Sequence, residues 1–220
     1  MKRIILLVFL LLTACGAAPA DVVPQVVTVY ATVAAEGWMA EIYDCAERTP
    51  GVLAARGFDI SSADISLRIG EPARLTSLAY QIGETEIAVV SRAGNSVTSL
   101  TVSQVAGLFS GRIRSWAEIG GEDAAVGIWV YDRGDDLQAA FDGTILGGGS
   151  ISSLARQAIS PGAMRDVIAE DENALGILPN AWVDDDLQVL YKTGAFPVLA
   201  VTRSEPTEAV RAMLVCLQRE

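Results

Sequence analysis

Segments with the apolar pattern of strands alternate along this chain with segments that have the pattern of helices. The predicted strands cover residues 25–30, 63–67, 86–90, 126–130, 173–178, 187–190 and 196–201. The predicted helices cover residues 36–47, 72–80, 136–141 and 206–217, with a further helix that begins at residue 101. This alternation is typical of α/β folds with mostly parallel sheets, so we predict that fold class.

The helix that begins at Thr101 has the clearest signals of any element. Gln104 follows Thr101 at the spacing of a capping box, in which each residue satisfies a free amide at the start of a helix. Gly111 is available for the left-handed conformation that ends such a helix. Apolar residues recur between them at helical spacing, and we interpret them as core: Val102, Val105, Leu108 and Phe109.

The segment from Leu100 to Gly121 also resembles a segment of the phosphate-type solute-binding proteins that serve ABC importers. The residues that recur at fixed spacing are Leu100-Thr101, Phe109-Ser110-Gly111, Trp116 and Ile119-Gly120-Gly121. A looser likeness extends over residues 26–219 and includes Ala63-Asp64-Ile65 and Ala174-Leu175-Gly176-Ile177-Leu178. The resemblance implies a two-lobed fold of the type II periplasmic-binding-protein-like class, with a discontinuous first lobe.

This resemblance also implies the limits of the two lobes. We expect lobe I to contain residues 26–92 and 183–220, and lobe II to contain residues 97–180, with residues 93–98 as the crossing. The chain is shorter than the usual phosphate binder of this family. We therefore expect a shallower cleft.

The amino terminus has the pattern of a lipoprotein signal. Lys2 and Arg3 precede an apolar run over residues 4–12, and the run leads into Leu12-Thr13-Ala14-Cys15. Such a run spans about 14 Å as a helix, much less than the ~30 Å hydrocarbon core of a membrane. The resemblance to a bacterial lipobox implies that residues 1–15 are a signal peptide, that Cys15 is acylated and that residues 16–25 form a tether. An ordinary secretory signal with an incidental cysteine is the alternative.

Composition narrows the choice of partners. The sequence has 16 Lys and Arg against 27 Asp and Glu, for a formal net charge of −11. This charge repels nucleic acid and gives no basic patch for anionic lipid, so we expect no nucleic-acid partner. The chain has no histidine, which removes the commonest general base and the commonest metal ligand. We therefore expect no enzyme, no cofactor and no metal site.

Two acidic runs are the remaining candidates for catalysis by paired carboxylates. They are Asp135-Asp136 and Asp184-Asp185-Asp186. Side chains adjacent in sequence usually point in different directions, so one pocket rarely uses both members of such a pair. We interpret both runs as solvated turn charges, and an acidic-residue hydrolase remains as a hypothesis.

The candidate ligand-binding residues follow predicted strands. In the family, an arginine and a Ser-Gly-Thr turn at a helix start hold the oxyanion. Here Asp135 and Asp136 stand at the serine and glycine positions, and two carboxylates in a first helical turn should repel a dianion. The full candidate set is Thr32, Arg68, Arg133, Gly134, Asp135 and Asp136.

Three of these candidates each have a second interpretation. Arg133 and Arg68 are candidate oxyanion clamps, but Arg133 could instead pair with Asp132 or Asp135. Arg68 could instead be a solvated loop residue. Thr32 could donate to a ligand or could cap a helix.

Cys45 and Cys216 raise the question of a disulfide. The family topology brings the two chain ends into the same lobe, and an extracytoplasmic location allows disulfide formation. The hypothesis is a bridge between the first and last helices. The alternative is two small buried thiols.

We therefore expect a lipid-anchored extracytoplasmic protein of the cell membrane, monomeric, that captures a small anionic solute such as phosphate for an ABC permease. The alternative is an interaction or sensory lipoprotein that keeps this fold without a ligand.

Overall fold

The computed structural model describes residues 23–72, 74 and 76–219. The predicted signal peptide, Cys15 and residues 16–22 of the predicted tether lie outside the described residues. Within the described part, no helix is both long enough and apolar enough to cross a membrane.

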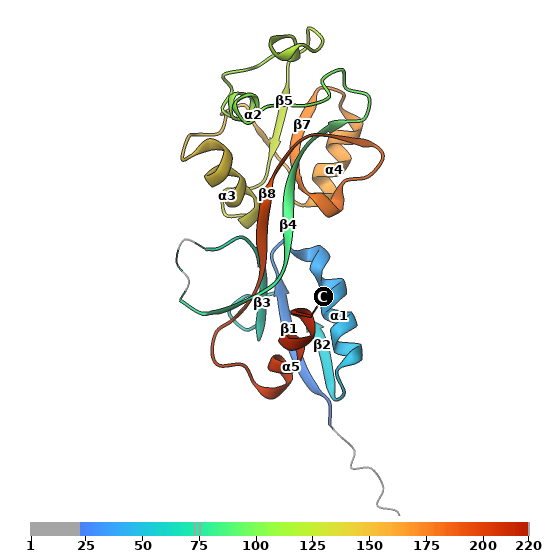
Figure 1. The fold of residues 1–220 in the computed structure, drawn as a ribbon, viewed down its shortest axis with the longest axis vertical. Helices are drawn as coiled ribbons and strands as arrows, with labels where there is room; N and C mark the ends of the chain where they lie inside the picture. The colour runs from blue at the N-terminus through green and yellow to red at the C-terminus, as the bar shows by residue number, and fades with distance from the viewer. Residues whose placement is uncertain (1–22, 73, 75, 220) are drawn as a thin grey trace, which may run out of the picture.

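Two lobes lie end to end and are joined by two long strands (Figure 1). Lobe I contains β1 (Gln25–Ala31), α1 (Met39–Arg48), β2 (Val52–Arg56), β3 (Ile65–Ile69) and α5 (Glu208–Leu217). Lobe II contains α2 (Val102–Phe109), β5 (Gly127–Val130), α3 (Asp136–Phe141), β6 (Arg156–Gln157), α4 (Pro161–Glu170) and β7 (Ala174–Pro179). The long strands are β4 (Leu78–Arg92) and β8 (Leu187–Thr202).

The strands form one eight-stranded sheet in the order β2-β1-β3-β8-β4-β7-β5-β6. Parallel pairs lie at the two ends of this sheet, where β1 pairs with β2 and β3, and β5 pairs with β6 and β7. The pairs in the middle, which involve β8 and β4, are antiparallel. The predicted α/β class is confirmed, but the expectation of mostly parallel pairing is wrong, because the long strands β4 and β8 pair antiparallel and parallel pairing is confined to the outer part of each lobe.

Strands β4 and β8 carry the chain between the lobes. In lobe I, Tyr80 of β4 pairs with Ala200 of β8, which also pairs with β3. In lobe II, Val89 of β4 pairs with Ile177 of β7. The register of β4 against β8 shifts between Gln81 and Gly83 and again after Glu86. The chain therefore crosses from lobe I to lobe II within β4, and not at residues 93–98, where the sequence suggested the crossing.

The sequence interpretation assigned residues 72–80 to a helix, which is wrong for the described residues of this segment. Residues from Leu78 onward belong to β4, because pairing with the facing strand β8 outweighs the local helical spacing of the apolar residues. The two strands predicted at 187–190 and 196–201 are one strand, β8. The prediction also omitted β2, β6 and α4.

The predicted capping box of α2 is confirmed, and Val105, Leu108 and Phe109 are buried as expected, but Val102, the first residue of the helix, is half exposed and does not belong to the core. In α2, the Thr101 side chain accepts a hydrogen bond from the Gln104 amide at 3.3 Å, and the Gln104 side chain accepts one from the Thr101 amide at 2.8 Å. Gly111 has the predicted left-handed backbone, with φ of 75°. A Cβ at Gly121 would lie 2.9 Å from the Val97 side chain and 3.0 Å from the Cβ of Trp116, so this position requires glycine for close packing.

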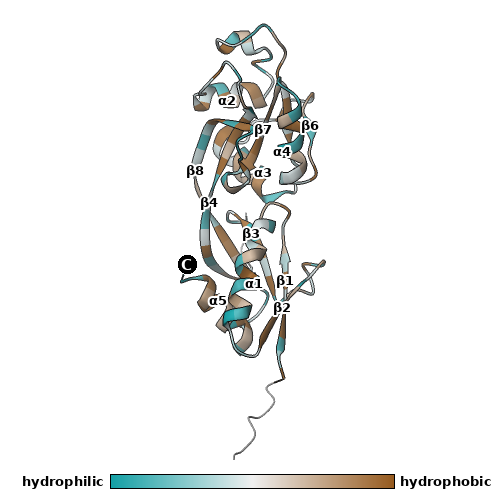
Figure 2. Cartoon of the chain, turned by 90° about the vertical axis from the view of Figure 1, so that its right-hand side faces the viewer, coloured by the Kyte–Doolittle hydropathy of each residue, from teal (hydrophilic) through white to brown (hydrophobic). Residues whose placement is uncertain are grey.

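The buried apolar residues of the two lobes form one connected core. Figure 2 shows hydrophobic residues concentrated on the strands, with mixed helices beside them. Every residue of β7 is buried. In lobe I, a disulfide between Cys45 and Cys216 joins α1 to α5 across 171 positions of sequence. This disulfide holds the carboxy-terminal helix α5 against α1, near the start of the described chain.

Candidate functional site

A cavity of about 480 Å³ lies where the two lobes face each other. Lobe I contributes Tyr30, Thr32 and Val33 to its lining, from the carboxyl end of β1. Lobe II contributes Tyr131, Asp132, Gly134, Asp135, Asp136, Gln157, Ala158 and Ile159, which follow β5 or lie at β6. Ligands of α/β proteins bind at the carboxyl ends of strands. Two other cavities, of about 260 and 510 Å³, are lined by residues on the lobe II side alone. We therefore place the candidate site in the cavity between the lobes.

The carboxylate of Asp136 joins the two lobes across this cavity. One of its oxygens, Oδ2, accepts hydrogen bonds from the Thr32 hydroxyl at 2.8 Å and from the Ile69 amide at 2.6 Å, both in lobe I. The other oxygen, Oδ1, accepts a bond from the Leu137 amide at 3.0 Å within lobe II. The side chain of Asp136 is buried, with 5% of the residue exposed. Buried charge is tolerated when hydrogen bonds satisfy it in this way.

Asp135 has a different role, as the residue that caps α3. Its Oδ1 accepts hydrogen bonds from the amides of Leu137 at 2.9 Å and Gln138 at 3.2 Å. Burial raises the pKa of Asp135 to about 6, and the neighbouring negative charge of Asp136 adds to this shift. The Asp135 carboxyl therefore changes its charge near neutral pH, unlike an ordinary surface aspartate.

Gln138 holds the loop between β5 and α3, a role that was not predicted from the sequence. This fully buried side chain accepts a hydrogen bond from the Tyr131 amide at 2.9 Å and donates one to Asp142 at 2.7 Å. Asp132 accepts a bond from the Gly134 amide at 2.8 Å. The sequence signal that could have identified Gln138 is its position as a polar residue on the apolar side of α3, between Leu137 and Phe141.

Tyr131 is also buried, and its hydroxyl has no hydrogen-bond partner among the described residues. Burial raises the pKa of Tyr131, and the charge of Asp135 adds to the effect. The hydroxyl therefore stays neutral and keeps both its donor and its acceptor capacity.

The structure brings together four of the six predicted site residues. Thr32, Gly134, Asp135 and Asp136 line the cavity. The Thr32 hydroxyl also accepts a bond from the Ala35 amide at 3.3 Å, in the turn before the short helix Glu36–Trp38. Thr32 is not the cap of that helix or of α1, whose N-cap residues are Ala35 and Trp38, and its donation to a ligand stays a prediction.

Neither Arg68 nor Arg133 is among the described residues that line the cavity. Arg68 donates through Nε to the Gly70 carbonyl at 3.1 Å, and Arg133 is exposed. Burial raises the pKa of Asp142, while the bond from Gln138 and the charge of Arg133 oppose that shift. The charged residues of the described lining are Asp132, Asp135 and Asp136, with no lysine or arginine among them.

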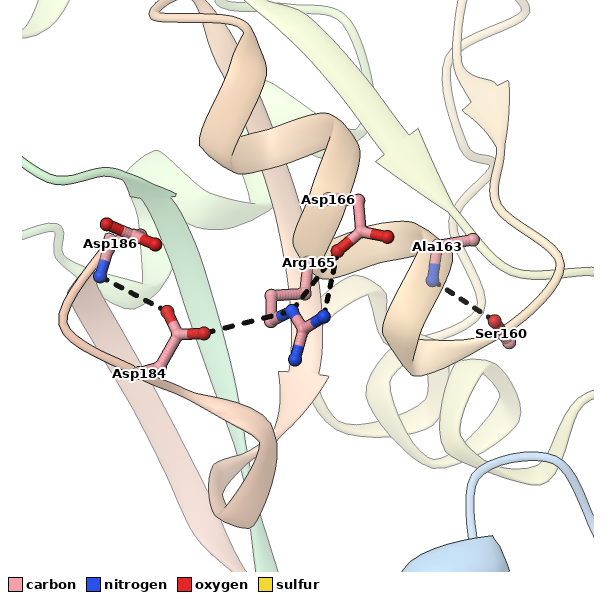
Figure 3. Close-up of polar contacts among 6 residues, drawn as sticks. All are labelled: Ser160, Ala163, Arg165, Asp166, Asp184 and Asp186. Carbon is pink, nitrogen blue, oxygen red and sulfur yellow. Dashed lines mark hydrogen bonds and ion pairs between the residues drawn. The ribbon is translucent and has the colours of Figure 1, made fainter.

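The second acidic run lies on the surface of lobe II. Asp184 accepts a hydrogen bond from the Asp186 amide at 3.2 Å and lies 3.8 Å from Arg165, which also binds Asp166 (Figure 3). These carboxylates are exposed, as the sequence suggested. The interpretation of Asp136 as a solvated turn charge was wrong, because the facing lobe buries this residue. Within the described residues, no cluster of three or more acidic or cysteine side chains is placed to hold a metal ion.

No protein-family model matches the sequence, but solved structures resemble the fold. A candidate phosphate ABC transporter substrate-binding protein from Clostridium perfringens, solved with bound phosphate, superposes with a TM-score of 0.80 at 19% identity. The match covers 88% of this chain and 93% of that one. This chain has the type II periplasmic-binding-protein-like fold.

Other solved structures with this fold come from both transport and regulatory proteins. An ABC-type phosphate transport receptor from Vibrio cholerae matches with a TM-score of 0.67 at 16% identity, over 88% of this chain and 93% of that one. The CcmR regulatory domain from Synechocystis, in complex with 2-PG, matches with a TM-score of 0.64 at 9% identity, over 88% and 96%. At these identities the likeness establishes the fold alone.

Proposed function

We propose that this protein is an extracytoplasmic solute-binding protein that captures a small solute between its lobes and delivers it to an ABC permease. The observation that carries the proposal is the cavity lined from both lobes at the ends of β1 and β5. A solute held there would contact both halves of a hinged molecule, so that binding would favour the closed form. The solute-binding neighbours support this proposal, and we propose binding rather than catalysis.

The two long strands provide the hinge that this function needs. β4 and β8 are the chain segments that pass between the lobes, and their register shifts where they cross. Hinges of this kind concentrate the change of backbone angles in a few residues while the lobes move as rigid bodies. Opening about these strands would part Asp136 from its partners in lobe I.

We further propose that the mature chain is held at the cell membrane by lipid on Cys15, with a short tether before lobe I, and that it acts as a monomer. The support is the amino-terminal sequence pattern. Metabolic labelling with a radioactive fatty acid should mark the wild type, and Cys15→Ala should abolish the label. A labelled Cys15→Ala variant would contradict this anchor.

The experiment for the binding function is a thermal-shift screen with neutral, cationic and anionic solutes. A binder gains about 2.7 kcal/mol of stability at a hundredfold excess of solute over its dissociation constant. A reproducible shift with one solute class, confirmed by calorimetry with one site per chain, is the expected result.

The second candidate function is an interaction or sensory lipoprotein that keeps the fold without a solute. One observation favours it, because Asp136 of lobe II already binds lobe I directly. This candidate predicts that no member of the screen changes the melting temperature.

A further inference from the structure

The donors that lobe I presents to the cleft converge on a single oxygen. The Thr32 hydroxyl and the Ile69 amide both donate to Oδ2 of Asp136, at 2.8 and 2.6 Å. Two donors aimed at one anionic oxygen form the arrangement that also binds an oxygen of an external oxyanion. In this chain the anionic oxygen belongs to the protein itself.

We propose that Asp136 is a built-in anion that occupies the donor pair of lobe I, so that the lobes close without solute and the cleft rejects oxyanions such as phosphate and sulfate. The inference rests on the proposed solute-binding function and adds the class of solute to it. The cleft then selects neutral or cationic solutes.

The position of the Asp136 carboxylate is fixed from both sides. Its second oxygen accepts a bond from the Leu137 amide, and the fully buried side chains of Leu137 and Gln138 anchor this part of α3 in lobe II. The carboxylate is therefore held at the donors of lobe I without free rotation. An external anion that competed for these donors would have to displace a group that is covalently attached and already in place.

The negative charge of the cavity lining also opposes the binding of an oxyanion. Asp132 and Asp135 line the cavity beside Asp136, and no lysine or arginine belongs to its described lining. A dianion entering this cavity would approach several carboxylates at short range, where repulsion in a partly desolvated site is strong. A cation or a neutral donor would instead gain from these oxygens.

The first arm of the test measures closure without solute. Fluorescent labels on cysteines introduced at the exposed positions Ala40 of lobe I and Ala117 of lobe II would report the distance between the lobes of the full chain in detergent. We expect the wild type to be mainly closed and Asp136→Ala to move most molecules to a longer distance. Asp136→Asn keeps the shape of the side chain and should give an intermediate result.

Asp166→Ala is the matched control. It removes an exposed carboxylate of the same lobe that pairs only locally with Arg165, as Figure 3 shows. It should leave the distance unchanged. If Asp136→Ala and Asp136→Asn, both shown to be folded by their thermal melts, keep the wild-type distance, the inference is wrong.

The second arm measures the binding of inorganic phosphate by calorimetry. We expect Asp136→Ala to bind phosphate at least tenfold more tightly than the wild type, because it frees two donors and removes one negative charge. Wild-type binding that is as tight as that of the variant would overturn the inference while supporting the proposed solute-binding function. Closure that depends on Asp136, together with a screen in which no solute binds, would instead overturn the proposed function and leave the closure role of Asp136 intact.

Discussion

Asp135 and Asp136 are adjacent in sequence, yet their carboxylates serve different partners. Asp135 accepts bonds from two amides of its own helix, whereas Asp136 accepts bonds from the opposite lobe. Burial and the charge of Asp136 hold the pKa of Asp135 near 6. Asp135 therefore caps α3, while the next residue, Asp136, makes the contact between the lobes.

Asp135→Asn should remove a pH dependence of stability. The folded-state pKa of about 6 lies above the ordinary value of 3.8, so the folded protein binds more protons than the unfolded chain between these pH values. The free energy of unfolding of the wild type should therefore fall as pH rises from about 4 to 6. Asparagine keeps a capping oxygen without the charge.

Because Asp135 is partly exposed, we expect Asp135→Asn to gain only about 1 kcal/mol over the wild type at pH 8 and nothing at pH 4. Urea unfolding at both pH values measures this difference. A variant that is less stable than the wild type at pH 8 would show that the charged cap stabilises α3 more than its burial disfavours it.

At this scale the sequence predicted where the polar residues of the cleft would cluster, but not the direction in which each side chain points. Thr32, Gly134, Asp135 and Asp136 line the cavity. Arg68 faces the Gly70 carbonyl instead, since the direction of a long side chain depends on neighbours that are distant in sequence. The contact of Asp136 with lobe I could not be derived from the sequence for the same reason.

Helices α1 and α5 meet in lobe I although they stand near opposite ends of the chain, and the Cys45–Cys216 disulfide joins them. Such a bridge closes a very long loop and so restricts the unfolded chain strongly. Replacing both cysteines with serine should lower the free energy of unfolding by about 2–5 kcal/mol, as measured by urea denaturation. Reducing the wild type should cause a similar loss, and a midpoint unchanged in both cases would contradict this account.

Gly83 lies in β4 where the strand passes from lobe I toward lobe II. A Cβ at this position would lie 2.1 Å from the Trp38 ring, so alanine forces the indole or the strand to move. Gly83→Ala should therefore destabilise the protein by about 1–3 kcal/mol in thermal or urea unfolding.

The matched control for Gly83→Ala is Gly194→Ala on the facing strand β8. No atom lies within 4 Å of a Cβ built at Gly194. This control should change stability by no more than about 0.5 kcal/mol. Equal effects of the two substitutions would show that close packing against Trp38 is not what requires glycine at position 83.

Elements with strong local signals could be predicted, and elements defined by pairing could not. The capping box of α2 satisfies its amides within four residues, so the sequence alone indicates it. The length of β4 depends on two partner strands that are more than 80 positions away along the chain, β7 and β8. Local spacing therefore suggested a helix at residues 72–80, where the long strand begins.

In the described part of the chain, β4 and β8 join two lobes (Figure 1). Residues of both lobes line a cavity between them. The general plan of a discontinuous lobe around a continuous one could be inferred from the sequence through its resemblance to a family. The acidic character of the cleft could be inferred only in part, because the two arginines expected there do not line it. A function in solute capture requires that ligand binding depends on this cavity and not on the outer surface of either lobe.

The most direct test of solute capture is to compare the binding of the best solute from the screen to the wild type and to a variant with a filled cleft. Gly134→Trp places a large side chain at the cavity lining, whereas Gly143→Trp places the same side chain at an exposed site of lobe II where no atom lies within 4 Å of the built Cβ. Calorimetry should show one site in the wild type and in Gly143→Trp, and at least tenfold weaker binding in Gly134→Trp. Unchanged affinity in Gly134→Trp, or no binding to the wild type by any solute in the screen, would contradict the proposal that the lobes capture a solute between them.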